Sequence, residues 1–193
     1  MNENRYPVLI LSLAFLFLVG CAGGDEPSPS QTAWPYGADF TYKENAIRVH
    51  VNADPQLNQF NGNPRTLHVC IYQLRTPNDL NQVAFNRDGL YQLLDRDCGY
   101  SAGSVAGSRA LTVHPGEENT YIYDRMEGAK FIAFVAGYFS LEKERILKME
   151  RIPVKLVEEK EGMFSTRQVA TVPDMNVDIQ FGAEQIQRIS VKP

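Results

Sequence analysis

The strongest constraint on the fold of this chain is a repeated alternation of apolar and polar residues. It occurs over residues 47–51, again over 67–71 and again over 177–181, with Ile, Val, Leu or Phe at every second position. A period of two is typical of a β-strand that buries one face. Residues 131–139 are apolar throughout, which predicts a central strand covered on both faces. The chain is therefore expected to be all-β.

One segment, residues 78–97, has a different pattern. Its apolar residues recur at the three- and four-residue spacing of amphipathic helices, and they are Leu80, Val83, Ala84, Leu90, Leu93 and Leu94. Asp88 is available to cap the second of two short helices, with a break near Asp88-Gly89. Further strands are expected over 110–113, 120–123 and 151–157. About seven short strands with one helical insertion predict a two-sheet β-sandwich.

The N-terminus carries a stretch from Val8 to Val19 that is apolar except for Ser12. It is too short to span ~30 Å of hydrocarbon, which takes roughly 20 helical residues. The stretch instead indicates the hydrophobic region of a signal peptide. It ends in Leu18-Val19-Gly20-Cys21, which resembles the lipobox of bacterial lipoproteins more than an Ala-x-Ala cleavage site. A cleaved, unlipidated secretory protein is the alternative, because Glu3 and Arg5 leave little positive bias ahead of the apolar stretch.

The lipobox resemblance implies removal of residues 1–20 and lipidation of Cys21. Three fatty chains on one cysteine would hold the protein permanently, since stable anchoring takes two such signals. In bacterial lipoproteins, an Asp directly after the lipidated cysteine is the signal for retention in the inner membrane. Ala22 stands at that position here, so the resemblance implies an outer-membrane location facing the periplasm. Residues 21–44 are rich in Gly, Pro and Ser and predict a flexible linker. The β-sandwich domain is expected to occupy residues 45–193.

The charge of the chain excludes some partners. Its formal net charge is −4, whereas a nucleic-acid-binding domain or a polybasic membrane contact requires clustered Lys and Arg. No nucleic-acid partner is therefore expected.

Four segments together resemble the TssJ family, the outer-membrane lipoproteins of type VI secretion systems. They are Ala53-Asp54-Pro55-Gln56-Leu57-Asn58, Leu67–Leu74 with its Ile-Tyr-Gln-Leu end, Leu111–Glu117 and Phe131–Tyr138. The resemblance implies a transthyretin-like sandwich with an added helical element. It also implies a noncatalytic protein, without cofactor or small-molecule substrate, that binds the periplasmic C-terminal domain of the inner-membrane protein TssM.

In that family the loop between the first two strands makes the contact. The corresponding residues here are Asp54, Gln56, Leu57, Asn58, Gln59, Phe60, Asn61 and Asn63. A loop of about a dozen residues without its own secondary structure is more often functional or disordered than a mere connector. Leu57 and Phe60 either form an exposed apolar anchor or fold back onto the sandwich, and the sequence is consistent with both interpretations.

Cys70 and Cys98 remain once Cys21 is lipidated, an even pair in an oxidising compartment. If the helical insertion covers the strand face that carries Cys70, Cys98 can reach it and form a disulfide. Two separate buried thiols are the alternative.

Other motifs are weaker. Gly99-Tyr100-Ser101-Ala102-Gly103 matches the Gly-x-Ser-x-Gly pattern, but no Asp or Glu lies between Ser101 and the next histidine, as a hydrolase triad in this chain order requires. His50, His68 and His114 lack the paired spacing of a zinc site, so no metal is expected. The main alternative function is an outer-membrane lipoprotein whose sandwich binds a carbohydrate or another periplasmic ligand.

Overall fold

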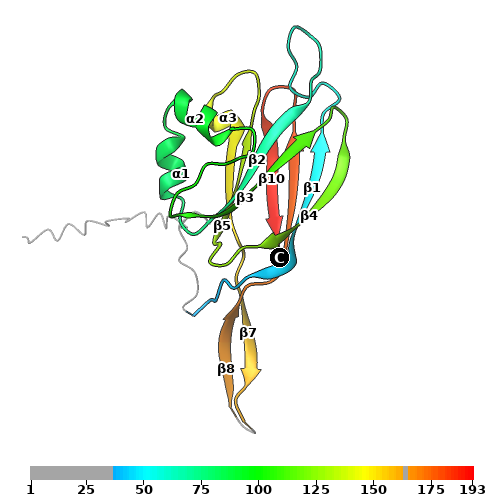
Figure 1. Ribbon diagram of the computed structural model, residues 1–193. Helices are drawn as coiled ribbons and strands as arrows, with labels where there is room; N and C mark the ends of the chain where they lie inside the picture. Colours follow the sequence, from blue (N-terminus) through cyan, green and yellow to red (C-terminus); the bar gives the residue numbers. More distant parts are fainter. Residues whose placement is uncertain (1–36, 163–164) are drawn as a thin grey trace, which may run out of the picture. The chain divides into compact units, whose positions relative to one another are not determined.

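The computed structural model describes residues 37–162 and 165–193. The predicted signal peptide, Cys21 and residues 22–36 of the predicted linker lie outside the described residues. Residues 37–44 of that predicted linker are described: Phe40 is buried, and the first strand begins at Lys43. No helix in the described part of the chain is long and apolar enough to cross a membrane. The described residues form two four-stranded sheets, a separate two-stranded sheet and three short helices (Figure 1).

The first sheet has the strand order β10-β9-β1-β4. Its strands are β1 (Lys43–Ala53), β4 (Glu118–Arg125), β9 (Met175–Phe181) and β10 (Ile186–Lys192). β1 pairs antiparallel with β4 on one side and parallel with β9 on the other. β1 is therefore an interior strand, and its alternation of apolar and polar residues places Ile47, Val49 and Val51 on the buried face.

The second sheet has the order β3-β2-β5-β6, with all pairs antiparallel. Its strands are β2 (Leu67–Leu74), β3 (Val105–Val113), β5 (Phe131–Ala136) and β6 (Leu147–Arg151). β5 has a neighbour on each side, and five of its six residues are buried. The prediction of a central strand covered on both faces is confirmed.

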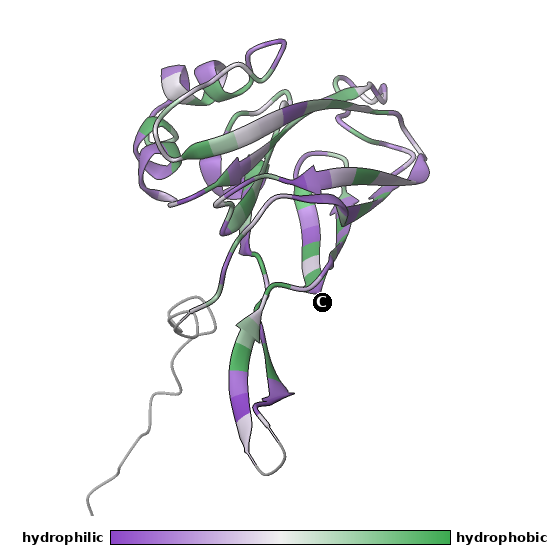
Figure 2. Cartoon of the chain, turned by 60° about the horizontal axis from the view of Figure 1, so that its bottom comes forward, coloured by the Kyte–Doolittle hydropathy of each residue, from purple (hydrophilic) through white to green (hydrophobic). Residues whose placement is uncertain are grey.

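The inner faces of the two sheets supply one continuous hydrophobic core. Along β1 and β9, buried apolar residues alternate with more exposed polar residues. Figure 2 colours the chain by the hydropathy of each residue. Val49, Val69, Phe134, Val177 and Phe181 are each almost completely buried. The two-sheet β-sandwich predicted from this period is confirmed.

The helical insertion consists of α1 (Asn78–Val83) and α2 (Arg87–Leu93). The break lies at residues 84–86, not at Asp88-Gly89 as predicted, because the Asn86 side chain accepts a hydrogen bond from the Gly89 amide at 2.8 Å and caps α2. Gly89 is required inside α2, since a Cβ there would lie 1.7 Å from the carbonyl oxygen of Val83. Asp88 is thus a residue of the first turn, not the cap.

Several elements differ from the sequence prediction. The strand expected over 151–157 is instead the end of β6, a connection and the start of β7 (Lys155–Lys160), which pairs with β8 (Thr166–Thr171) in a separate hairpin. The short helix α3 (Lys143–Ile146) and the edge strand β10 were not predicted. Every residue of β7 is exposed, so β7 has no buried face from which a period could arise.

Candidate partner-binding site

The loop between β1 and β2 has an ordered backbone. The Asp54 carboxylate accepts a hydrogen bond from the Gln56 amide at 2.7 Å, and the Asp54 carbonyl accepts one from the Leu57 amide at 2.9 Å. This is the local turn that Asp favours because its side chain can mimic a backbone acceptor. Further along, the Arg65 amide donates to the Leu57 carbonyl at 2.9 Å. The two ends of the loop are therefore joined at its base.

Two side chains attach the loop to the sandwich. Leu57 is 0% exposed and belongs to the hydrophobic core, so it folds back and offers no apolar anchor to a partner. Asn58, with φ +46°, donates from its amide to the Thr66 carbonyl at 3.0 Å and accepts from the Phe139 amide at 3.0 Å. Asn tolerates this left-handed backbone better than most residues. Asn58 thereby links the β1–β2 loop to the segment that follows β5.

The tip of the loop is a two-residue hairpin turn. Phe60 and Asn63 exchange two backbone hydrogen bonds, of 2.9 and 3.1 Å. Between them, Asn61 and Gly62 have φ values of +52° and +76°, the combination that a type I′ turn requires and that Asn-Gly favours. The loop thus has secondary structure of its own, contrary to the expectation of an irregular segment. Asn61 and Asn63 are exposed on this turn.

An aromatic cluster lies beside the turn. The rings of Phe60 and Phe139 are 4.2 Å apart between centroids, at 41°. The Arg65 guanidinium lies over the Phe60 ring, 4.9 Å from its centroid. Phe60 is half-buried, whereas Phe139 is 66% exposed. We call Phe60, Arg65 and Phe139 the aromatic cluster.

Phe139 was missed by the sequence reasoning, since it lies 79 positions from Phe60 and only the sheet order brings the two together. The signal in the sequence was a large apolar residue at the end of the strand predicted over 131–139, which is weak evidence taken alone. A single exposed apolar side chain is ordinary on protein surfaces.

A small hollow of about 130 Å³ adjoins the aromatic cluster. Its lining comes from three loops and consists of Asn58, Gln59, Tyr138, Phe139, Ser140, Ala183 and Glu184. The Gln59 amide donates to the Ala183 carbonyl at 3.0 Å, and the Glu184 carboxylate pairs with Arg145 at 2.8 Å. The Tyr138 hydroxyl donates to the Gln185 carbonyl at 2.8 Å, and burial raises the pKa of Tyr138 above its ordinary value. This end of the sandwich is therefore held together by hydrogen bonds among three loops.

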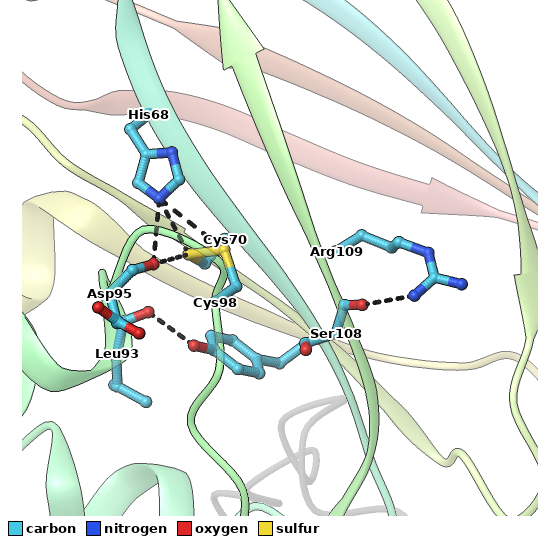
Figure 3. Close-up of a disulfide and its surroundings, with 8 residues drawn as sticks. His68, Cys70, Leu93, Asp95, Cys98, Ser108 and Arg109 are labelled. Atoms are coloured by element: carbon cyan, nitrogen blue, oxygen red, sulfur yellow. Dashed lines mark hydrogen bonds between the residues drawn. A yellow bond between two sulfur atoms is a disulfide. The ribbon is translucent and has the colours of Figure 1, made fainter.

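Cys70 and Cys98 form a disulfide, with their Cα atoms 5.4 Å apart (Figure 3). It joins β2 to the segment after α2, and the Tyr72 hydroxyl donates to the Leu93 carbonyl beside it at 2.6 Å. The His68 Nε2 lies 3.4 Å from Cys70 Sγ. His68, Cys70 and Cys98 are the one cluster of residues of metal-ligand type within residues 37–162 and 165–193. While the two sulfurs are bonded to each other, neither is a thiolate ligand.

The Gly-x-Ser-x-Gly segment does not have the geometry of a hydrolase. Ser101 is exposed in the loop between the end of α2 at Leu93 and the start of β3 at Val105. A nucleophile elbow requires the opposite order, a strand that turns into a helix.

The outer face of the first sheet is polar along β1 and β9. A shallow hollow of about 210 Å³ on it is lined by His50, Asn52, Asp178, Ile179, Gln180, Arg188, Ser190 and Lys192. No Phe, Tyr or Trp belongs to this lining, although aromatic rings on a sheet face are what the carbohydrate-binding alternative predicts. Lys192 and Asp178 already pair with each other at 3.2 Å.

A β-sandwich that presents an ordered loop with aromatic and amide groups at one end has the architecture of a binding module. The sequence model of the type VI secretion lipoprotein family, whose members are described as VasD, EvfM and TssJ, matches residues 45–183. The chain belongs to this family. It is a type VI secretion lipoprotein of the TssJ type, and that family is structural, not enzymatic.

Solved structures share the fold. The T6SS lipoprotein TssJ1 from Pseudomonas aeruginosa is 19% identical with a TM-score of 0.54, covering 79% of this chain and 97% of that one. Lip of Serratia marcescens, a membrane-bound component of the type VI secretion system, is 17% identical with a TM-score of 0.54, covering 76% and 96%. A chain from a structure described as the T6SS protein TssM C-terminal domain from EAEC is 15% identical with a TM-score of 0.51, covering 76% and 97%. No curated protein is significantly similar in sequence.

Proposed function

We propose that this protein is anchored to the outer membrane through lipidated Cys21 and tethers the periplasmic C-terminal domain of TssM to that membrane. Three observations support the proposal: membership of the TssJ family, the lipobox ahead of Cys21, and the ordered β1–β2 loop. The loop lies at one end of β1, and the described chain begins near the other end, at Gly37 (Figure 1). The segment that leads from Cys21 therefore enters the described domain near the end of β1 that lies away from the loop.

The observation that carries the proposal is the aromatic cluster on an ordered loop. Binding costs less when the contacting segment is already ordered, because less conformational entropy is lost. Aromatic and Arg side chains are the residues most enriched in binding hot spots. Phe139, the more exposed of the two rings, is the apolar anchor, and the exposed Asn61 and Asn63 on the turn after Phe60 supply hydrogen-bonding groups.

The test is a binding titration with the purified periplasmic C-terminal domain of the TssM protein encoded with this chain. A Phe139→Ala variant is expected to weaken binding roughly 30-fold, the effect of a hot spot worth about 2 kcal/mol. Phe85→Ala is the matched control, since Phe85 is an 85% exposed aromatic residue between α1 and α2 of the helical insertion. Equal affinity of the Phe139→Ala variant and the parent protein would exclude the aromatic cluster from the contact.

A further inference from the structure

We infer that β1 is the strand through which this tether transmits mechanical force: it carries tension from the lipid-linked N-terminus to the partner-binding loop. The inference rests on the proposed function. One strand connects the two attachment places, because β1 begins six residues after the first described residue and ends directly before the loop. Tension applied to the β1–β2 loop then runs along a single backbone instead of across the hydrogen bonds between strands. Tension applied to Phe139 reaches that loop through the ring contact with Phe60 and the hydrogen bond to Asn58.

The segment that precedes and opens β1 is held by several contacts. Phe40 is buried, and its carbonyl accepts a hydrogen bond from the Gly128 amide at 2.7 Å. The Tyr42 amide donates to the Glu127 carboxylate at 2.6 Å, and the Tyr42 hydroxyl donates to Asp124 at 3.0 Å. We call Phe40, Tyr42, Asp124, Arg125 and Glu127 the N-terminal cluster.

Asp124 also fixes the irregular backbone at the start of β1. Its second carboxylate oxygen accepts from the Asn45 amide at 2.8 Å, where Asn45 has the left-handed φ of +54°. The Asn45 amide and the Tyr42 hydroxyl together hold the pKa of Asp124 below its ordinary value. Asp124 therefore stays ionised, and keeps both contacts, at neutral pH.

Arg125 is a buried cation in the same cluster. It is 3% exposed, and its guanidinium donates to the carbonyls of Thr41, Val172 and Pro173 at 3.1–3.2 Å. Buried charges persist only where such partners satisfy them. Arg125 thereby joins the N-terminal segment to the segment that leads into β9, the parallel neighbour of β1.

The other end of β1 is fixed as well. The Ala53 amide donates to the Glu117 carbonyl and the Asp54 amide to the Phe181 carbonyl, both at 2.8 Å. Three residues later, Leu57 is inserted into the core. Between the two fixed ends, β1 is paired with β4 and β9 on both sides.

An extended strand yields little when it is pulled at both ends. A β-strand rises about 3.3–3.4 Å per residue, and the fully extended chain reaches only ~3.6 Å per residue. β1 can therefore lengthen by less than about a tenth before its covalent backbone is taut. Tension that enters and leaves through β1 does not pull apart the rest of the sandwich.

The test places force on this path without a partner protein. Asp39→Cys and Asn63→Cys provide attachment points on either side of β1, in the full chain with Cys21→Ser, and the chain is held in magnetic tweezers with trypsin present. Between these points trypsin has two sites, Lys43 and Arg48, both in β1. A second chain carries Asp39→Cys and Pro193→Cys, which load the sandwich from the starting end of β1 and the finishing end of β10.

At a force that makes the second chain unfold and become trypsin-sensitive, the first chain is expected to be cleaved no faster than at zero force. Asp124→Ala in the first chain is expected to allow cleavage under load, because it removes two contacts of the N-terminal cluster. Asp178→Ala is the matched control, since the side-chain contacts that it removes are to Ser190 and Lys192 on β10, which β9 separates from β1.

Force-dependent cleavage of the first chain would overturn the inference. Equal rates of cleavage under load for the Asp124→Ala and Asp178→Ala variants would overturn it as well. Neither outcome bears on TssM binding, which the titration above measures separately. A chain that resists cleavage but does not bind TssM would refute the proposed function alone.

Discussion

Replacing Leu57 with Ala separates two roles of the β1–β2 loop, packing and partner contact. Leu57 is completely buried in the core, and Leu→Ala substitutions at such positions cost about 2–5 kcal/mol. The expected loss in the free energy of unfolding is near the middle of that range, about 3 kcal/mol. The assay is urea unfolding of the Cys21→Ser protein with and without the substitution.

The same variant is expected to bind TssM more weakly, because a loop released from the core must be ordered again on binding. Ordering costs roughly 1–2 kcal/mol per residue, so a few released residues suffice for a large loss of affinity. Phe139→Ala is the comparison, with weaker binding at nearly unchanged stability. If Leu57→Ala weakened binding while the unfolding free energy fell by less than about 1 kcal/mol, Leu57 would be an exposed anchor and the packing described here would be wrong.

Three further predictions concern the stability of the domain. The Cys70–Cys98 disulfide closes a loop of sequence separation 28, so its reduction is expected to cost about 3–4 kcal/mol in urea unfolding, and mass spectrometry without reductant should find the two thiols bonded. Gly62→Ala places an L-residue at φ +76° and is expected to cost roughly 1–2 kcal/mol, whereas Gly103→Ala, where a Cβ meets open space, serves as a near-neutral control. The hydrogen bond from Lys43 holds the pKa of Asp174 below its ordinary value, so its contribution is present above the unfolded pKa near 4 and is lost as pH falls through the lower folded value. The urea midpoint of Asp174→Asn should therefore fall less between pH 6 and pH 2 than that of the parent protein.

Strands with a buried face could be predicted from the sequence because burial imposes a period on them. This holds for β1, β2, β5 and β9, which were found within a few residues. β7 and β8 form an exposed hairpin and have no such period. β10 lies at a sheet edge and its pairing is irregular between Ile186 and Arg188, which interrupts the alternation.

The candidate site was predictable only in part, because its residues come from loops far apart in the chain. The turn formers between residues 54 and 64 indicated a loop, and the family resemblance indicated its role. Burial of Leu57 and contact between Phe60 and Phe139 depend on how the two sheets and the segment after β5 meet. Local pattern carries no information about that meeting, and the parallel pairing of β1 with β9 was hidden for the same reason.

The most direct test of the tether is recruitment of the TssM periplasmic domain to vesicles that carry the lipidated protein. The parent protein is expected to bring that domain down with the vesicles. Cys21→Ser should abolish this recruitment while binding in solution persists, and Phe139→Ala should leave the protein on the vesicles without its partner. Unchanged recruitment of the TssM domain in each of the two single variants would contradict the account.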